Sequence, residues 1–149
     1  MKKENVFSVL VGLLLCALVS SCGGGGDNSS KIVGKYSMDG RDDYECEFSA
    51  GGKYTSSVVD ESHGYAIDTP GEWEVKGDVV YIKTRLTDVT ARDLSGDVDE
   101  EAKESMLNSM KEVAGEMPVQ ERELNIVKLD GSGMTLEANG LEQVYTRIE

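Results

Sequence analysis

The sequence predicts a mainly β domain, an antiparallel barrel or sandwich that carries one inserted amphipathic helix. Short runs of alternating apolar and polar residues, separated by Gly-rich or Asn-Gly turns, recur along most of the chain. In one segment the apolar spacing changes from the period of a strand to that of a helix. Hairpin spacing of this kind connects neighbouring antiparallel strands, so it favours a barrel or sandwich over alternating βα units.

The first half of the domain is predicted to consist of short strands joined by tight turns. We expect strands over residues 32–38, 44–48, 53–59, 63–68, 72–76 and 79–85. Thr69-Pro70-Gly71 is expected to break the chain between two of these strands, because proline cannot donate to a sheet ladder. Gly77-Asp78 fits a two-residue hairpin turn.

The second half begins with a polar segment and the helix. Residues 86–96 are polar and are predicted to form a loop. Residues 97–115 are predicted to form the helix, with an acidic first turn, apolar residues at helical spacing and Gly115 as its stop. Strands are expected again over residues 123–129, 134–138 and 141–148, with Asn139-Gly140 as the strongest hairpin signal.

The N-terminal residues carry the pattern of a secretory signal. Lys2 and Lys3 precede an apolar run of 14 residues over 6–19. This run is shorter than the about 20 residues that a spanning helix needs. The motif Val19-Ser20-Ser21-Cys22 then resembles the lipobox of bacterial lipoproteins. That resemblance implies cleavage before Cys22 and several acyl chains on this cysteine, which attach the mature chain to a bacterial membrane. The alternative is a plain secretory signal that leaves Cys22 as a free thiol.

The chain thus divides into a signal peptide over 1–21, a flexible Gly/Ser tether over 22–30 and one folded domain over 31–149. Glycines follow Cys22, and they form neither an aspartate-type retention signal nor an acidic export tag. We therefore expect the protein in the cell envelope, on the outer membrane rather than the inner. With Cys16 in the signal and Cys22 acylated, Cys46 has no disulfide partner and is predicted to be a small buried core residue.

The charge of the chain excludes some classes of partner. It carries 28 acidic and 15 basic residues, for a formal net charge of −13. Nucleic-acid binding requires a basic surface, and so does direct adsorption of the domain to anionic lipid. The simplest interpretation is a solvated, self-repelling surface. A cationic ligand or partner is the alternative.

Several strand motifs together resemble the small lipocalin-like lipoproteins of bacteria. Gly34-Lys35-Tyr36 is similar to the Gly-x-Trp opening of their barrels, with tyrosine in the place of tryptophan. Residues 48–54, 71–75 and 77–82 look like the Gly- and aromatic-rich hairpins of that family. The resemblance implies an antiparallel lipocalin-like β-barrel of about eight to nine strands. It also implies that the closing Arg147 packs over the opening Tyr36, as a cation–π pair.

No set of residues in the sequence predicts catalysis. The single histidine, His63, would have to serve any triad, and the chain contains no Gly-x-Ser-x-Gly element. One histidine and one free cysteine are too few for zinc, and the acidic clusters at 39–47 and 97–101 lack EF-hand spacing. We therefore predict no enzyme, no metal and no cofactor.

Binding remains as the predicted function. A barrel of about eight strands leaves room for side chains or for one small ligand. We expect a non-catalytic envelope protein that binds a small apolar or amphipathic ligand, with Tyr54, Trp73 and Tyr81 as pocket or core aromatics. Met106, Met110 and Val113 mark the helix either as a lid or docking face or as an element packed on the barrel exterior. The alternative function is an interaction module that binds an envelope protein through its acidic surface or this helix.

Overall fold

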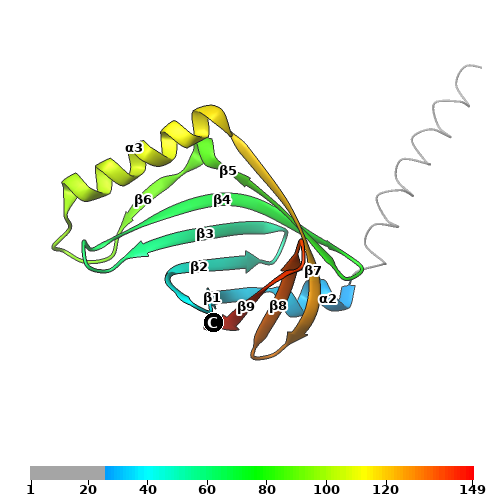
Figure 1. The fold of residues 1–149 in the computed structure, drawn as a ribbon. Helices are drawn as coiled ribbons and strands as arrows, with labels where there is room; N and C mark the ends of the chain where they lie inside the picture. Colours follow the sequence, from blue (N-terminus) through cyan, green and yellow to red (C-terminus); the bar gives the residue numbers. More distant parts are fainter. Residues whose placement is uncertain (1–25) are drawn as a thin grey trace, which may run out of the picture.

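Residues 26–149 are the part of the chain that this computed structural model describes, with side chains from Asn28 onward, and nine strands account for most of them (Figure 1). In chain order the elements are α2 (Gly26–Ile32), β1 (Gly34–Met38), β2 (Arg41–Ser49), β3 (Lys53–Asp60), β4 (Tyr65–Lys76), β5 (Val79–Arg85), η1 (Leu86–Asp88, a 3-10 turn), β6 (Thr90–Asp93), α3 (Glu100–Glu116), β7 (Val119–Asp130), β8 (Gly133–Ala138) and β9 (Leu141–Arg147). The predicted class, mainly β with one long helix, is confirmed.

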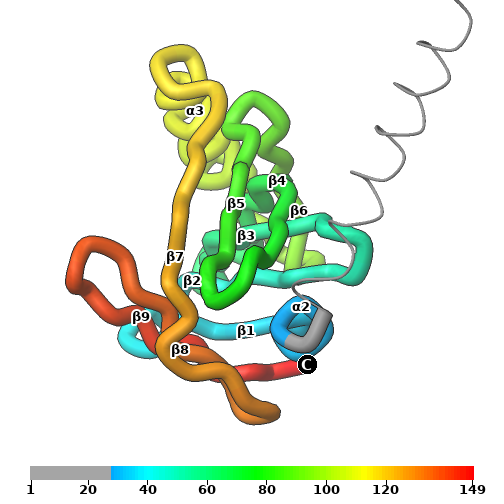
Figure 2. The backbone as a smooth tube through the Cα atoms, turned by 90° about the vertical axis from the view of Figure 1, so that its right-hand side faces the viewer, coloured from blue at the N-terminus to red at the C-terminus, as the bar shows by residue number. Residues whose placement is uncertain are grey.

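Eight of the strands close into an antiparallel barrel, so the sandwich alternative is excluded. Their order around the ring is β3-β2-β1-β9-β8-β7-β5-β4, and a further β4–β3 pairing closes it. Strand β6 pairs with β4 and lies outside the closed ring. Figure 2 shows how β7 runs from the end of α3 down to the β8–β9 hairpin and so connects the two ends of the molecule.

Strand β4 is continuous through Pro70, which corrects the predicted break at residues 69–71. On one side residues 65–72 pair with β3, and on the other side the strand pairs first with β6 and then with β5. Trp73 donates its backbone N–H to Gly52 O at 2.8 Å, on the β3 side. Alternation along the strand therefore turns the nitrogen of Pro70 to the opposite side, where η1 interrupts the β5–β6 edge. No ladder donor is needed there, which is why the strand tolerates a proline.

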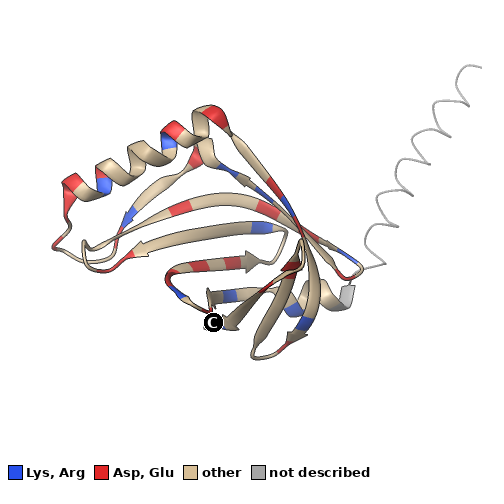
Figure 3. Ribbon diagram, in the orientation of Figure 1, with Lys and Arg blue, Asp and Glu red and all other residues tan. Residues whose placement is uncertain are grey.

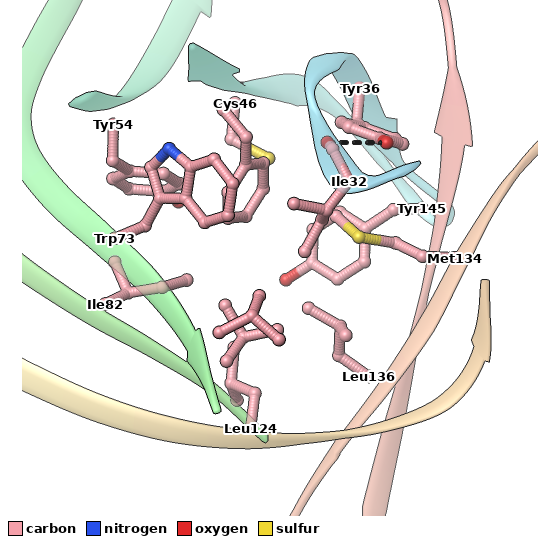
Figure 4. Packing of buried hydrophobic residues seen from close by; sticks show 13 residues of the cluster. Ile32, Tyr36, Cys46, Tyr54, Trp73, Ile82, Leu124, Met134, Leu136 and Tyr145 are labelled. Carbon is pink, nitrogen blue, oxygen red and sulfur yellow. Dashed lines mark hydrogen bonds between the residues drawn. The ribbon is translucent and has the colours of Figure 1, made fainter. Parts of the chain in front are cut away.

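The core fills the closed half of the barrel (Figure 4). Phe48 is at its centre, and the rings of Tyr36, Tyr54 and Trp73 meet it edge to face, with centroids 6.0, 5.0 and 5.5 Å away. The indole N–H of Trp73 donates to Ser49 O at 3.0 Å, so burial leaves it a partner. This half of the interior is a packed core of aromatic and aliphatic side chains.

Helix α2 plugs the closed end and changes the predicted tether. Residues 22–30 were expected to be flexible, but the chain is helical from Gly26, where α2 begins. Ile32 is fully buried in the core, and Asn28 Nδ2 donates to Gly77 O at the β4–β5 turn, 3.1 Å away. These two contacts dock the helix on the barrel. None of the helices within residues 26–149 combines the length and apolar composition needed to cross a bilayer.

Helix α3 covers the other end of β4. Asp99 caps the helix by accepting a hydrogen bond from the backbone N–H of Ala102 at 2.9 Å. The backbone N–H of Asp99 in turn donates to His63 O at the β3–β4 turn, which fixes the start of the helix on that hairpin. The helix ends at Glu116, one residue past the predicted stop at Gly115.

Candidate functional site at the open end of the barrel

The inner face of β4 is apolar at both ends and polar or small in the middle. Trp73 and Val75 belong to the main core, and Tyr65 and Ile67 belong to a second apolar cluster under α3. All four lie on the same face, because residues two apart in a strand point the same way. Thr69 and Gly71 lie between the two clusters. Helix α3 therefore packs on the inner face of the strand, at the end where the barrel opens.

A band of polar side chains lines the interior between the two clusters. Ser56 is the register partner of both Cys46 and Thr69, and Thr84 is the partner of Gly71, so these side chains face inward. With Arg122 and the two tyrosines described next, they form what we call the inner polar band: Tyr44, Tyr54, Ser56, Thr69, Thr84 and Arg122.

Arg122, on β7, reaches across the interior to two tyrosines. Its register partner is the core residue Ile82, so its side chain points inward. Nη2 donates to the hydroxyl of Tyr54 at 3.2 Å, and that hydroxyl lies 3.0 Å from the hydroxyl of Tyr44. Burial by itself lowers the pKa of Arg122, but the neighbouring oxygens of Tyr54 and Tyr44 favour the charged guanidinium and raise that pKa above its ordinary value. The guanidinium therefore stays positively charged.

The inner polar band contains hydroxyls that have no protein partner in the described chain. Within the described residues, the hydroxyls of Ser56, Thr69 and Thr84 make no hydrogen bond, although Thr69 and Thr84 are only 6% and 4% exposed. Among those residues, the only buried side-chain nitrogen or oxygen without a partner is Nε of Arg147. The oxygens of the three hydroxyls therefore have no protein partner among these residues and yet keep some accessible surface. They are the polar groups between the main core and α3 that a water or ligand atom could pair with.

The closed end of the barrel is locked by Arg147. Its guanidinium carbon lies 4.9 Å from the ring centroid of Tyr36, so the structure brings this predicted pair together. Nη1 donates to Val33 O at 2.6 Å, and Nη2 donates to Lys31 O at 2.5 Å and to the Tyr36 hydroxyl at 2.7 Å. The same side chain thus ties the end of α2 to β1 and β9. These contacts make Arg147 a structural residue.

The remaining predicted aromatics separate into two groups. Tyr54 and Trp73 are interior, but Tyr81 lies on the outer face of β5, where its register partners are Glu74 and Glu123. The ammonium of Lys76 lies 5.2 Å from the Tyr81 ring centroid. The side chain of Tyr81 therefore points away from the barrel core. A hollow of about 580 Å³ crosses β4, β5 and β7, and its lining combines the inward-facing Trp73, Ile82 and Arg122 with outward-facing residues, among them the glutamates Glu72, Glu74, Glu121 and Glu123.

The three helix residues singled out from the sequence also separate. Met110 packs against the second apolar cluster, together with Ala102 and Leu107. Met106 and Val113 are 39% and 49% exposed and contribute nothing to that contact. Apart from Ala114, no residue of α3 is fully buried, so the helix is held by a thin layer of contacts.

The described structure places Cys46 in the core and His63 beside Asp60. Cys22 and the signal peptide over 1–21 lie outside the described residues. Burial raises the pKa of the Cys46 thiol to about 12, which keeps it protonated and unreactive. His63 Nδ1 lies 2.8 Å from a carboxylate oxygen of Asp60, and hydrogen bonds from Ser62 and His63 lower the pKa of Asp60 to about 2. Within the part of the chain that the structure describes, no three His, Cys, Asp or Glu side chains are grouped to hold a metal.

Arg122 is the residue that the sequence interpretation missed. The strand was expected to start at residue 123, which left Arg122 outside it, whereas β7 begins at Val119. The signal was present, because Arg122, Leu124 and Ile126 alternate along one strand and only the last two are apolar. Glu121 and Glu123 flank Arg122 in the sequence but point outward, so neither can neutralise it.

Two solved structures resemble this fold. One is a lipocalin-like protein from Bacteroides uniformis, with a TM-score of 0.51 and 13% identity, covering 79% of this chain and 99% of that one. The other is an uncharacterized protein from Bacteroides eggerthii, with a TM-score of 0.52 and 23% identity, covering 78% of this chain and 98% of the other. No family model matches the chain, and no curated protein matches it significantly.

The fold is therefore lipocalin-like: a closed eight-stranded antiparallel barrel with one extra strand and one main helix. Folds of this kind hold small ligands at their open ends or in their interiors. Here the closed half is filled by side chains, and the inner polar band is the part of the described interior that has unpaired hydroxyls and the guanidinium of Arg122.

Proposed function

We propose that this protein is a lipid-anchored, non-catalytic protein of the cell envelope that binds a small amphipathic ligand at the open end of its barrel. The observation that carries the proposal is the inner face of β4, where a polar band separates two apolar clusters. An amphipathic molecule offers both kinds of surface. The flanking cluster under α3, with Tyr65, Ile67 and Val89 as its buried members, would receive the apolar part.

The thin packing of α3 supports entry at this end. The helix contacts the barrel through partly buried Ala102, Leu107 and Met110, and its other apolar side chains are largely exposed. Segments that have few buried contacts open at the lowest free-energy cost. Movement of α3 away from Ile67 would widen access to the band without disturbing the main core.

Native mass spectrometry of protein purified from its own host tests this proposal. Wild type is expected to carry a small organic molecule or to take one up from a lipid extract. Ser56→Phe fills the inner polar band and should abolish that added mass. Thr55→Phe is the matched control, because residue 55 is the neighbour on β3 and points to the outer face. Wild-type protein that stays ligand-free in both experiments would contradict the proposal.

The anchor is tested separately. Cys22→Ser should move the protein from the membrane fraction to the soluble fraction, and mass spectrometry of the wild-type N-terminal peptide should show acyl chains on Cys22. An unmodified mature N-terminus in membrane-bound wild type would overturn the lipid anchor and leave the ligand proposal standing.

A second candidate function is docking to another envelope protein. It is favoured by the exposed apolar side chains of Met106 and Val113 on α3. Charged residues are spread over the whole fold rather than gathered on one element (Figure 3), so the acidic surface by itself singles out no docking face. A photo-crosslinking residue at position 113 in intact cells should capture a discrete partner. Absence of any adduct there, with efficient capture at a control envelope complex, would count against docking.

A further inference from the structure

We infer that the polar group of the ligand is an anion, such as a carboxylate, which pairs with Arg122 inside the barrel. This inference rests on the proposed function and specifies the chemistry of the same site. The other arginines of the chain all have several polar partners or a carboxylate partner. Arg41, Arg85 and Arg92 each pair with a carboxylate at 2.8 to 3.0 Å, whereas Arg147 binds two backbone carbonyls and a hydroxyl.

Arg122 differs from all of these. A guanidinium carries five N–H donors, and among the described residues the only partner of Arg122 is the hydroxyl of Tyr54. No carboxylate of the described chain lies within ion-pair distance, although the protein carries 28 acidic residues. A half-buried cation without a counter-ion is costly to maintain, so a bound anion would offset that cost.

The unpaired donors are also reachable. Within residues 26–149, Nε and Nη1 of Arg122 make no hydrogen bond, and neither is a fully buried atom, so both retain some accessible surface. Nη2 keeps a second N–H beside either Nε or Nη1, so a carboxylate entering the inner polar band could accept two parallel hydrogen bonds from one such pair. The hydroxyl of Tyr44, bonded only to that of Tyr54, would add a further donor.

The surroundings fix the sign of the preferred charge. The pKa of Tyr54 is raised by burial, so its hydroxyl remains a neutral donor. The glutamates that flank Arg122 point to the outer face. Within the described residues the inner polar band therefore holds one positive charge without a carboxylate partner, and this charge would favour an anionic ligand against the long-range field of the chain.

Titration with three probes that share one alkyl chain tests the inference. The probes are dodecanoate, dodecanol and dodecyltrimethylammonium, and Trp73, the single tryptophan, reports binding by fluorescence. Wild type is expected to bind dodecanoate at least about tenfold more tightly than dodecanol, and the cation more weakly than either. Arg122→Gln should remove this preference and leave dodecanol affinity unchanged, and Arg122→Lys should restore part of it.

Arg85→Gln is the matched control, because Arg85 is exposed and already paired with Glu72 at 2.8 Å. Its probe affinities should equal those of wild type, and circular dichroism verifies the fold of every variant. Equal affinity of wild type for dodecanoate and dodecanol would overturn the anion inference and leave ligand binding intact. Binding of none of the probes would overturn the proposed function together with the inference.

Discussion

The guanidinium of Arg147 stacks over the ring of Tyr36, with 4.9 Å between guanidinium carbon and ring centroid, and also donates a hydrogen bond to the hydroxyl of that ring. The hydroxyl of Tyr36 in turn donates a hydrogen bond to Ile32 O at 2.8 Å. The last strand, the first strand and helix α2 are thus held by one chain of contacts. The contact between its closing arginine and opening tyrosine is the one that the resemblance to lipocalin-like lipoproteins implies.

Replacement of Arg147 should lower stability without affecting the open end. Arg147→Lys keeps the positive charge but loses the planar fork, and we expect a loss of about 1–2 kcal/mol in the free energy of unfolding. Arg147→Ala also leaves Val33 O without its partner and should cost about 2–4 kcal/mol. Urea unfolding measures both. Arg85→Lys, in an exposed pair, should change stability by less than about 0.5 kcal/mol, and an equal loss in this control would contradict the assignment.

Gly34 is explained by the same arginine. A Cβ atom at this position would collide with Nη1 of Arg147 and lie 2.9 Å from Glu149 O, and the backbone φ is +154°. Gly34→Ala should therefore destabilise the barrel by about 1–3 kcal/mol. Its effect should be less than additive with Arg147→Lys in a double-mutant cycle, because both changes displace one side chain. Gly96→Ala, where a Cβ meets nothing within 4 Å, should be nearly neutral.

Cys46 should make the fold sensitive to alkaline pH. Burial raises the pKa of its thiol from 9.0 to about 12, so the unfolded chain loses this proton first. The contribution of this thiol to the free energy of unfolding is constant below pH 9. Above pH 9 the free energy of unfolding falls as pH rises toward 12, and the loss is about 1–2 kcal/mol at pH 10. Urea unfolding across this range should show a flatter pH profile in Cys46→Ala. An unchanged slope in that variant would assign the alkaline loss to other groups, such as Tyr54.

The docking of α3 is tested by two adjacent residues. Leu107 packs on the second apolar cluster and Met106 is 39% exposed. Leu107→Ala should speed amide hydrogen exchange across α3 and cost about 1–2 kcal/mol, less than for a fully buried leucine. Met106→Ala should leave both measurements within experimental error of wild type. Equal exchange rates in the two variants would show that α3 is held by something other than this cluster.

Much of the barrel could be predicted because its hairpins are encoded locally. The turn at Gly77 and the turn at Asn139-Gly140 lie where expected, with φ values of +62°, +54° and +78° that suit glycine and asparagine. The strands between them alternate clearly, so most inward-facing residues were identifiable. The N-cap at Asp99 likewise marked the start of α3 to within a few residues.

The parts that could not be predicted depend on partners distant in sequence. Pro70 breaks a strand only if its missing N–H faces a neighbour, and that depends on where β5 ends. Residues 90–93 are polar and too short to predict as β6 without knowledge of β4 beside them. Arg122 was missed for a local reason instead, because the strand was expected to start one residue after it, whereas β7 begins at Val119.

Helices α2 and α3 dock at opposite ends of β4, against Gly77 and Ile67 respectively. Twelve residues of extended strand separate these ends by roughly 36 Å. Only residues 23–25 lie between Cys22 and α2, so an acylated Cys22 would hold the plugged base of the barrel against the bilayer. The opening would then face away from the lipid. Exchange of cargo would proceed with the aqueous compartment or a carrier within it, rather than by lateral transfer from the membrane that anchors the protein.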